Sequence, residues 1–271
     1  MIVTRFAPSP TGYLHLGHAF AALTAAAAGE QFLLRIEDID RARCRPEFEA
    51  AIFEDLAWLG LEWEKPAPRQ SERTFAYQGA IQSLAARGLV YPCFCTRKDI
   101  ADEIARAGTA PHGAEGPFYP GICRELPEAV RRNRLASGMP YALRLDAAKA
   151  AAMAGSLGFR EHGVWIAVDP ATLGDVVLAR KEMPAAYHLA VVVDDAHQGV
   201  TLVTRGEDLL PATHVQRLLQ ALLNLPVPDY AHHRLILDEQ GRKFSKRDSS
   251  VTLRELRAKG VSALDVRARL A

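Results

Sequence analysis

The residues best placed to do chemistry stand near the N-terminus, in the segment His15-Leu16-Gly17-His18. Imidazole N–H groups at the start of a helix can donate hydrogen bonds to phosphate oxygens, and the glycine lets a nucleotide approach the backbone. The spacing is that of neither the dinucleotide fingerprint nor the P-loop. A lone histidine here would be interpreted as a solvated side chain. The whole segment from Arg5 to His18 instead favours a nucleotide site.

The elements expected around this segment are a strand, a sharp turn and a helix. Residues 2–6 predict a short strand, and two prolines and a glycine within residues 8–12 make the turn stiff. The alanine-rich stretch 19–28 predicts a helix that Gly29 closes at the C′ position. This order is typical of the phosphate-facing corner of a nucleotide-binding α/β sheet.

A second group of cations stands far downstream, at Lys243-Phe244-Ser245-Lys246-Arg247. A loop of this composition after a turn can clamp a polyphosphate, although an ordinary basic surface loop has the same composition. Residues 242–271 hold 9 Lys and Arg against 3 Asp and Glu, while the net charge of the chain is only +1. This distribution suits a local contact with RNA or ATP and argues against coating long stretches of nucleic acid.

Together, the segment from Arg5 to His18 and the loop from Lys243 to Arg247 resemble the two signatures of the glutamyl-type class I aminoacyl-tRNA synthetases. The resemblance implies that an amino-acid carboxylate attacks the α-phosphorus of ATP, which binds with Mg²⁺, and displaces pyrophosphate. It implies that the catalytic residues are His15, His18, Lys243 and Lys246, and that His15, Gly17, His18 and Lys246 bind ATP.

Glutamate has two carboxylates and one ammonium group, so its pocket needs arginines and an acid. Glu37 follows a predicted strand at 31–36, and Arg205 follows one at 200–204, so both are expected at the ligand-binding edge of the sheet. Tyr187 is expected where the chain enters a buried apolar strand. The resemblance implies glutamate binding by Arg5, Ser9, Glu37, Tyr187 and Arg205, and which arginine meets which carboxylate stays open.

Three of the four cysteines, Cys93, Cys95 and Cys123, cluster in the sequence. The spacing alone supports buried free cysteines and a metal site equally. Together with Tyr119, the three cysteines can supply three thiolates and one oxygen to tetrahedral zinc. The pattern resembles the zinc site in the connective insertion of short glutamyl-synthetase-like proteins, which implies a structural Zn²⁺ ion held by Cys93, Cys95, Tyr119 and Cys123.

The predicted fold class is α/β, with a doubly wound parallel, Rossmann-like sheet interrupted by a zinc-binding insertion and followed by a small C-terminal segment. Residues 1–90 and 184–236 are expected to form the two halves of the nucleotide-binding fold, the first ending in a strand near residues 89–94. Residues 91–183 form the insertion, which in the family holds the tRNA. Residues 237–271 carry the second signature loop.

The chain contains no apolar run that could span a bilayer, and the first signature begins almost at Met1. We therefore expect no signal peptide, no membrane contact and a cytoplasmic location. We also expect a monomer.

The chain ends 25 residues after Lys246, whereas a glutamyl-tRNA synthetase continues with a helical anticodon-binding domain. That early end, with the cysteine-containing insertion, resembles the glutamyl-queuosine tRNA(Asp) synthetases. The resemblance implies that glutamate is attached to the queuosine base in the anticodon loop of tRNA(Asp). Two alternatives stay open: a minimal synthetase that charges a tRNA 3′ end, and a catalytically idle, zinc-stabilised RNA-binding module.

Overall fold

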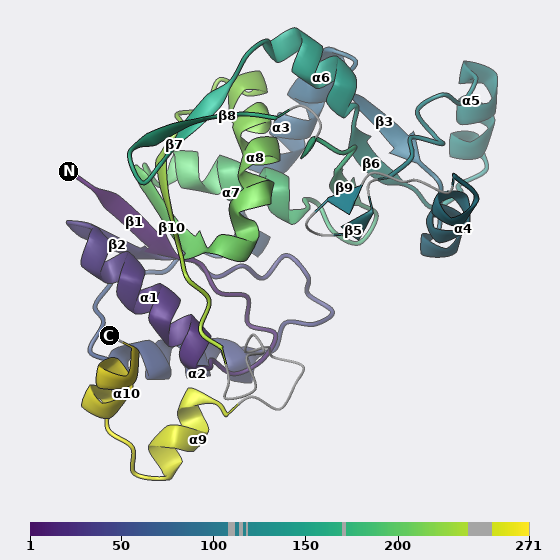
Figure 1. Ribbon diagram of the computed structural model, residues 1–271. Helices are drawn as coiled ribbons and strands as arrows, with labels where there is room; N and C mark the ends of the chain where they lie inside the picture. The colour runs from purple at the N-terminus through teal and green to yellow at the C-terminus, as the bar shows by residue number, and fades with distance from the viewer. Residues whose placement is uncertain (108–111, 114–115, 118, 170–171, 238–250, 271) are drawn as a thin grey trace.

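A parallel arrangement of strands combines residues 3–34 with residues 202–233 (Figure 1). The computed structural model describes residues 1–107, 112–113, 116–117, 119–169, 172–237 and 251–270. Strands β1 (Val3–Phe6) and β2 (Gln31–Leu34) pair in parallel, as do β10 (Leu202–Gly206) and β11 (Asp229–His233). The Thr201 N–H donates to the Val3 carbonyl at 3.0 Å and joins the two pairs, which confirms an α/β fold with a parallel sheet.

Helix α1 (Leu16–Ala28) connects β1 to β2 and packs against β1 and β10. Gly29 follows it as the C-cap in an extended conformation, with a φ of −106°, and not as the C′ residue that the sequence predicted. Glycine is needed there for a different reason, because any side chain at position 29 would collide with Thr4. The Thr4 hydroxyl donates to the Ala25 carbonyl at 2.7 Å and satisfies one of the last acceptors of the helix.

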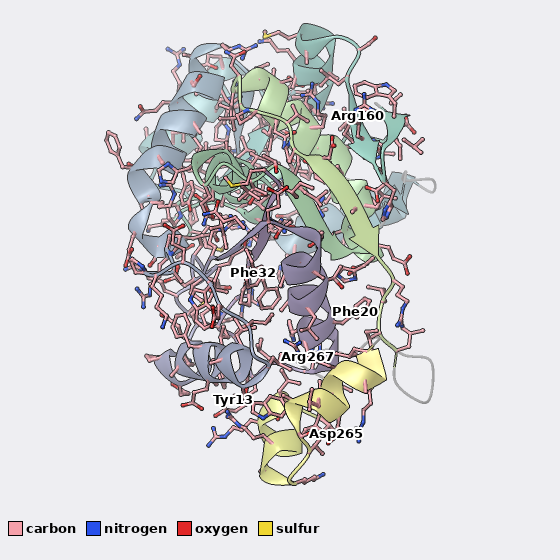
Figure 2. All side chains as sticks on the ribbon, turned by 90° about the vertical axis from the view of Figure 1, so that its left-hand side faces the viewer. Tyr13, Phe20, Phe32, Arg160, Asp265 and Arg267 are labelled. Atoms are coloured by element: carbon pink, nitrogen blue, oxygen red, sulfur yellow. The ribbon has the colours of Figure 1, made fainter. Side chains whose placement is uncertain are left out.

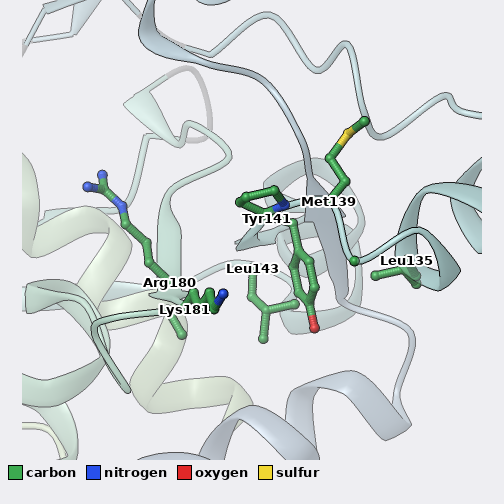
Figure 3. A pocket seen from close by; sticks show the side chains of 9 residues that line it. Leu135, Met139, Tyr141, Leu143, Arg180 and Lys181 are labelled. Atoms are coloured by element: carbon green, nitrogen blue, oxygen red, sulfur yellow. The ribbon is translucent and has the colours of Figure 1, made fainter.

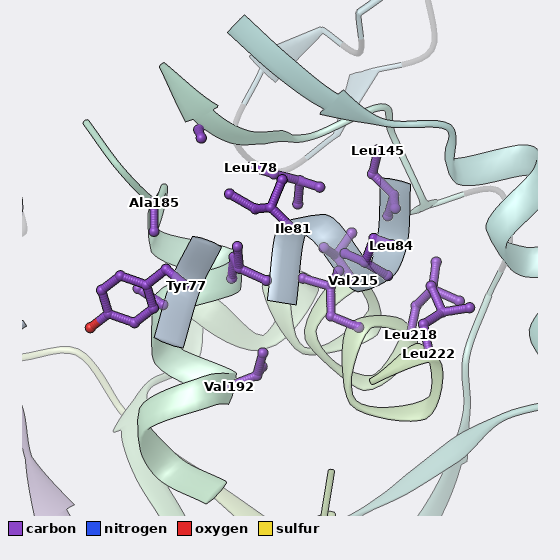
Figure 4. Close-up of a cluster of buried hydrophobic side chains, with 14 of the residues drawn as sticks. Tyr77, Ile81, Leu84, Leu145, Leu178, Ala185, Val192, Val215, Leu218 and Leu222 are labelled. Atoms are coloured by element: carbon purple, nitrogen blue, oxygen red, sulfur yellow. The ribbon is translucent and has the colours of Figure 1, made fainter. Parts of the chain in front are cut away.

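The larger hydrophobic core lies between three helices, α3 (Thr74–Ala86), α7 (Tyr187–His197) and α8 (Leu210–Leu222) (Figure 4). Burying a leucine side chain of this kind stabilises the fold by about 1.5–3 kcal/mol. The segment 187–197 was predicted to lead into a strand, and it forms α7 instead. An apolar run buried on several sides looks the same in sequence whether it is a strand or a helix, so periodicity could not distinguish them.

A second core holds the C-terminal helices α9 (Leu253–Ala258) and α10 (Ala263–Leu270) against α1 and α2 (Pro46–Trp58). Arg267 of α10 donates to the Leu59 carbonyl, with Nε at 3.0 Å, at the junction visible in Figure 2. The fully buried members of this core include Leu14, Ile52, Leu56, Leu253 and Val266. The described part of the C-terminal segment is therefore anchored to the elements that carry the first signature.

The middle of the chain builds a separate antiparallel sheet of β3 (Val90–Cys93), β6 (Ala142–Leu145) and β9 (Val177–Arg180). The strand predicted near 89–94 therefore forms but does not join the parallel sheet. Its residues alternate between half-buried and buried, as in an antiparallel strand with one covered face, whereas all four residues of β1 are buried. The hairpin β7 (Gly158–Glu161) and β8 (Val164–Ala167) extends the main sheet beyond β11.

The remaining elements are short. They are α4 (Arg97–Ala107), β4 (His112–Gly113), β5 (Gly116–Pro117), α5 (Glu128–Ala136), α6 (Ala147–Ala154) and the 3-10 turns η1 (Gln70–Glu72) and η3 (Glu207–Leu209). Of the helices in the described ranges, none is long and apolar enough to cross a membrane.

Candidate functional site

His15 and His18 cap the N-terminus of α1 in a reciprocal pair. The Nδ1 atom of His15 accepts a hydrogen bond from the Gly17 N–H at 3.1 Å, and the Nδ1 atom of His18 accepts from the His15 N–H at 3.2 Å. Because Nδ1 is an acceptor in both neutral rings, each ring carries its proton on Nε2 and presents it as a donor. Two ring donors at a helix N-terminus form a site suited to phosphate oxygens.

The end of the chain returns to this helix start. Thr252 pairs with His15 in an antiparallel bridge, and the Leu253 N–H donates to the Leu14 carbonyl at 2.8 Å. Lys243 and Lys246 of the second signature fall within residues 238–250, outside the described residues. Thr252 follows Lys246 by only six residues, so the fold brings the chain from the second signature back to the first.

Arg5 is buried and neutralised inside the fold. Its Nε atom lies 3.1 Å from an Asp195 oxygen, and Arg35 binds the same carboxylate from 2.7 Å. Burial acts to raise the pKa of Asp195, but Arg5 and Arg35 outweigh it and hold that pKa below its ordinary value. Arg5 also donates from Nη1 to the Thr204 carbonyl at 3.1 Å, which places it beside the start of the Arg205 cluster.

The neighbouring carboxylate, Asp194, ties α7 to the segment that leads into α3. It accepts hydrogen bonds from Gln70 at 2.8 Å, Arg73 at 2.6 Å and the Tyr77 hydroxyl at 2.7 Å. Sequence reasoning did not single out Asp194, Asp195 or Arg35. The available signal was the adjacent pair of acids directly after an apolar run. Carboxylates in such a position are expected to be buried, and buried carboxylates require buried hydrogen-bond donors.

Glu37 lies just past β2, with 12% of its side chain exposed. It accepts one hydrogen bond from Arg35 at 3.2 Å. Burial raises the pKa of Glu37 above its ordinary value, against the opposing effect of Arg35 and Arg5. A carboxylate in this condition is stabilised by a further cation such as an ammonium group. The Glu37 N–H donates to the Pro8 carbonyl at 3.0 Å, which brings the adjacent Ser9 alongside.

Arg205 lies within β10 rather than after it, and only 6% of the residue is exposed. Within the described part of the chain, no carboxylate oxygen lies within ion-pair distance of its guanidinium group. Every hydrogen-bond partner is instead a neutral group: His232 Nε2 at 3.0 Å, Gln216 at 2.8 Å, Thr213 at 2.7 Å and the Tyr187 hydroxyl at 3.2 Å. A buried cation without a counter-charge favours an anionic ligand.

His232 is kept neutral by its surroundings. Burial and the adjacent Arg205 both lower the pKa of His232, and they outweigh Glu161, which lies 2.7 Å from Nδ1. Since Nε2 accepts from Arg205, the ring proton is on Nδ1 and is donated to Glu161. Glu161 therefore fixes the tautomer of His232 without itself touching Arg205. Neither residue was predicted from the sequence: Glu161 belongs to β7 of the insertion and His232 to β11, and only the pairing of these two strands brings them together.

The structure brings the five predicted glutamate-binding residues into one region. Arg205 binds Tyr187 directly, and the carbonyl of the residue before Arg205 binds Arg5. Arg5 and Glu37 are linked through Asp195 and Arg35. The Tyr187 hydroxyl accepts from Arg205, so its own proton is available to a carboxylate.

The three predicted cysteine ligands also converge. The sulfur atoms of Cys93, Cys95 and Cys123 all lie within 4.8 Å of one another, and none forms a disulfide. Cys95 and Cys123 are 3.5 Å apart, close to the ~3.8 Å between two sulfurs of a tetrahedron with 2.3 Å Zn–S bonds. The Tyr119 hydroxyl lies 3.4 Å from Cys95 and accepts from the Cys123 N–H at 2.9 Å. These donors fit a zinc ion.

Comparison with known proteins agrees with this geometry. The family of class I tRNA synthetases (E and Q), catalytic domain, matches residues 1–269. The chain belongs to the class I tRNA synthetases of the E and Q type. It is 51% identical to the glutamyl-Q tRNA(Asp) synthetase of Rhodobacter capsulatus, with 98% of each chain covered. It is 46% identical to the protein of the same name from Nocardia farcinica, covering 98% of this chain and 82% of that protein.

A solved member of the synthetase family shows the same fold. The glutamate-tRNA synthetase of Elizabethkingia anophelis superposes with a TM-score of 0.73 at 30% identity, over 91% of this chain. The match covers 53% of that protein, so the chain spans about half its length. Membership of the class I synthetases confirms the predicted family and the parallel α/β fold. The predicted zinc-binding role of the insertion stays a prediction, supported by the cysteine cluster.

Proposed function

We propose that this chain uses ATP to activate glutamate and transfers the glutamyl group to the queuosine base in the anticodon loop of tRNA(Asp). The observation that carries the proposal is the 51% identity to a glutamyl-Q tRNA(Asp) synthetase across 98% of both chains. The site agrees, because Arg205, a buried cation with no carboxylate partner among the described residues, lies in one region with Glu37, a carboxylate whose pKa is raised.

The pocket residues divide the charges of glutamate between them. Arg205 meets one carboxylate, with the Tyr187 hydroxyl as a second donor, and Glu37 meets the ammonium group. The Nε–H group of Arg5 is bound to Asp195, and Arg5 retains further N–H groups for the other carboxylate. Ser9 adds a hydroxyl contact. Because Arg205 has no counter-charge among the described residues, we assign it the stronger role in binding glutamate.

Activation is a displacement at the α-phosphorus of ATP. A glutamate carboxylate oxygen forms the new P–O bond, and the bond to pyrophosphate breaks. Negative charge gathers on the phosphate oxygens, which the Nε2–H donors of His15 and His18 stabilise at the helix N-terminus. Gly17 leaves space for the nucleotide, and Lys243 and Lys246 neutralise the departing pyrophosphate. Mg²⁺ enters with ATP as a further counter-charge.

Transfer requires no nucleophile from the protein. A hydroxyl oxygen of the modified base attacks the carbonyl carbon of the adenylate, AMP leaves, and the hydroxyl proton is lost to the departing phosphate or to water. The protein contributes positioning and a pre-organised polar site. Residues 91–183 would hold the RNA, residues 1–90 and 184–236 would hold the nucleotide, and residues 237–271 would bring the second signature to it.

Zinc would have a structural role in the insertion. Cys93, Cys95, Cys123 and Tyr119 would supply four protein ligands, which leaves no position for a reactive water. The ion would hold the loop after β3 against the segment around Cys123, where the hydrophobic cluster is small.

The deciding experiment measures the transfer of labelled glutamate to tRNA(Asp) with and without queuosine. We expect label only on the queuosine-containing RNA, and we expect it to survive removal of the 3′-terminal nucleotides. Equal labelling of both RNAs would instead identify a minimal synthetase that charges the 3′ end of a tRNA. Absence of glutamate-dependent pyrophosphate exchange would favour an idle RNA-binding module.

A further inference from the structure

A cavity of about 350 Å³ lies in the insertion, outside the glutamate and nucleotide site (Figure 3). It opens between the end of α5, strand β6 and the end of β9. This volume falls in the range of about 300–1,000 Å³ that small-ligand pockets occupy. The side chains that give it chemical character are Leu135, Met139, Tyr141, Leu143, Arg180 and Lys181.

The cavity combines an aromatic face with an apolar floor. Tyr141 is 42% exposed, and its ring rests against Phe94, with the two ring centres 5.9 Å apart. Phe94 belongs to the buried cluster of Cys93 and Cys123, so the tyrosine ring is backed by packed side chains. Leu135 and Met139 are also exposed, at 40% and 43%. An exposed ring among apolar side chains is a stacking platform for a planar group.

Two cations stand at the rim of the cavity. Arg180 and Lys181 are both exposed and both line it. In the described part of the chain, no carboxylate lies within ion-pair distance of either. Arg134 of α5 does not line the cavity but adds positive charge nearby, with its guanidinium 5.6 Å from the centre of the Phe94 ring. The charge at the rim therefore complements a phosphate, whereas the interior suits a nucleobase.

The cavity lies close to the glutamate site along the chain. Strand β9 carries Arg180 and, two residues earlier, Leu178, whose carbonyl accepts from the Ala186 N–H at 2.7 Å. Ala186 caps α7, which begins at Tyr187. The path runs from Arg180 back to Leu178, across the hydrogen bond to Ala186 and on to Tyr187. With about 3.3 Å per strand residue, this path has a length on the order of 15 Å. A few unstacked nucleotides can cover that distance.

We propose that this cavity binds one unpaired base of the RNA loop that presents the acceptor base, stacked on Tyr141 with its phosphate on Arg180 and Lys181. This inference rests on the proposed function, since it requires an RNA whose loop bases are splayed out. Single-stranded loops are recognised in this way, by aromatic stacking combined with backbone charge. Binding at this site would fix the position of a second loop nucleotide relative to the nucleotide that receives glutamate.

The test uses tRNA(Asp) carrying queuosine and the full chain. Tyr141→Ala should raise the KM for tRNA by roughly 5- to 150-fold, the range that loss of one base–aromatic stack produces. The kcat at saturating tRNA should not change, and Tyr141→Phe should behave as the unsubstituted chain. Phe75→Ala is the matched control, because Phe75 is an aromatic side chain 89% exposed on α3, away from the cavity. An unchanged KM in Tyr141→Ala would overturn the proposal.

Two further measurements make the result independent of the transfer reaction. An anticodon hairpin with 5-iodouridine at single loop positions should crosslink to Tyr141 on irradiation, from one loop position and not from the stem. In filter binding, Arg180→Gln with Lys181→Gln should reduce the slope of log affinity against log salt by about 0.7, as the loss of one single-strand phosphate contact predicts. Arg160→Gln, on an exposed arginine of β7, is the control for charge alone.

These outcomes separate the two proposals. If the chain transfers no glutamate but the hairpin still crosslinks to Tyr141, the cavity assignment stands and the proposed acceptor is wrong. If transfer proceeds and no loop position crosslinks, the cavity assignment is wrong and the function stands. A change in sedimentation of the chain alone on Tyr141→Ala would also overturn it, because the cavity would then be a contact between two copies.

Discussion

Replacing Arg205 with glutamine tests the central assignment of the glutamate site. The substitution removes a buried cation that has only neutral partners among the described residues, and it leaves the nucleotide-binding residues untouched. A carboxylate bound at this site receives hydrogen bonds from the Arg205 guanidinium and from the Tyr187 hydroxyl, and Arg205→Gln removes only the first. At about 1.5–3 kcal/mol for a hydrogen bond to a charged group, the loss is about 1.5–3 kcal/mol. This corresponds to roughly 10- to 150-fold in kcat/KM for glutamate.

The assay is glutamate-dependent exchange of labelled pyrophosphate into ATP, supported by thermal unfolding with and without glutamate. Glutamate at about 100 times its Kd should stabilise the unsubstituted chain by about 2.7 kcal/mol, and the weaker binding should cut this gain to about 0.3–1.4 kcal/mol in Arg205→Gln. Arg217→Gln is the matched control, because Arg217 lies on α8 and donates to the Gly158 carbonyl at 2.9 Å instead of into the site.

A structural role for Arg205 would produce a different pattern. Arg35 provides the comparison, since it pairs with Asp195 at 2.7 Å and Arg35→Gln should cost about 3–5 kcal/mol of folding free energy. If Arg205→Gln lowers the stability of the free chain by as much, or if it retains the full glutamate-induced stabilisation, the reasoning from its missing counter-charge is refuted.

Three other predictions follow from the pKa shifts and the cysteine cluster. Because burial raises the pKa of Glu37, the KM for glutamate should rise on acidification at a pH above 4.5, the ordinary pKa of a glutamate side chain. Glu37→Gln should raise this KM by about 10- to 100-fold and abolish its pH dependence. A pH profile that is identical in both chains would contradict this prediction. Cys123→Ser should lose zinc by elemental analysis while keeping glutamate-induced stabilisation, and one bound zinc per variant chain would show that the ion lies elsewhere. Burial raises the pKa of Asp55 to about 6, so the free energy of unfolding should fall as pH rises from about 4 to about 6. Asp55→Asn should therefore stabilise the chain by roughly 1–3 kcal/mol at pH 7 and not below pH 4, as urea unfolding at both pH values would reveal.

Local sequence was sufficient to find the chemistry of the first signature. His15, Gly17 and His18 are neighbours in sequence, and a helix N-terminus that follows a strand and a stiff turn orients them through short-range bonds. The cysteine cluster was found for a similar reason, because its members lie within 31 positions and the residue types narrow the chemistry. The start of α7 was misjudged, since buried apolar runs carry no periodicity that separates helix from strand.

The sequence by itself determined which residue types are present for phosphate, carboxylate and zinc. Only the tertiary structure decided whether Arg5 and Arg205 are each paired with a carboxylate. Arg5 meets Asp195 across 190 positions, and Arg205 meets a histidine whose tautomer Glu161 fixes from another strand. These pairings depend on which strands lie side by side. The physical reason is that charge compensation acts over a few ångströms in space, whatever the separation along the chain.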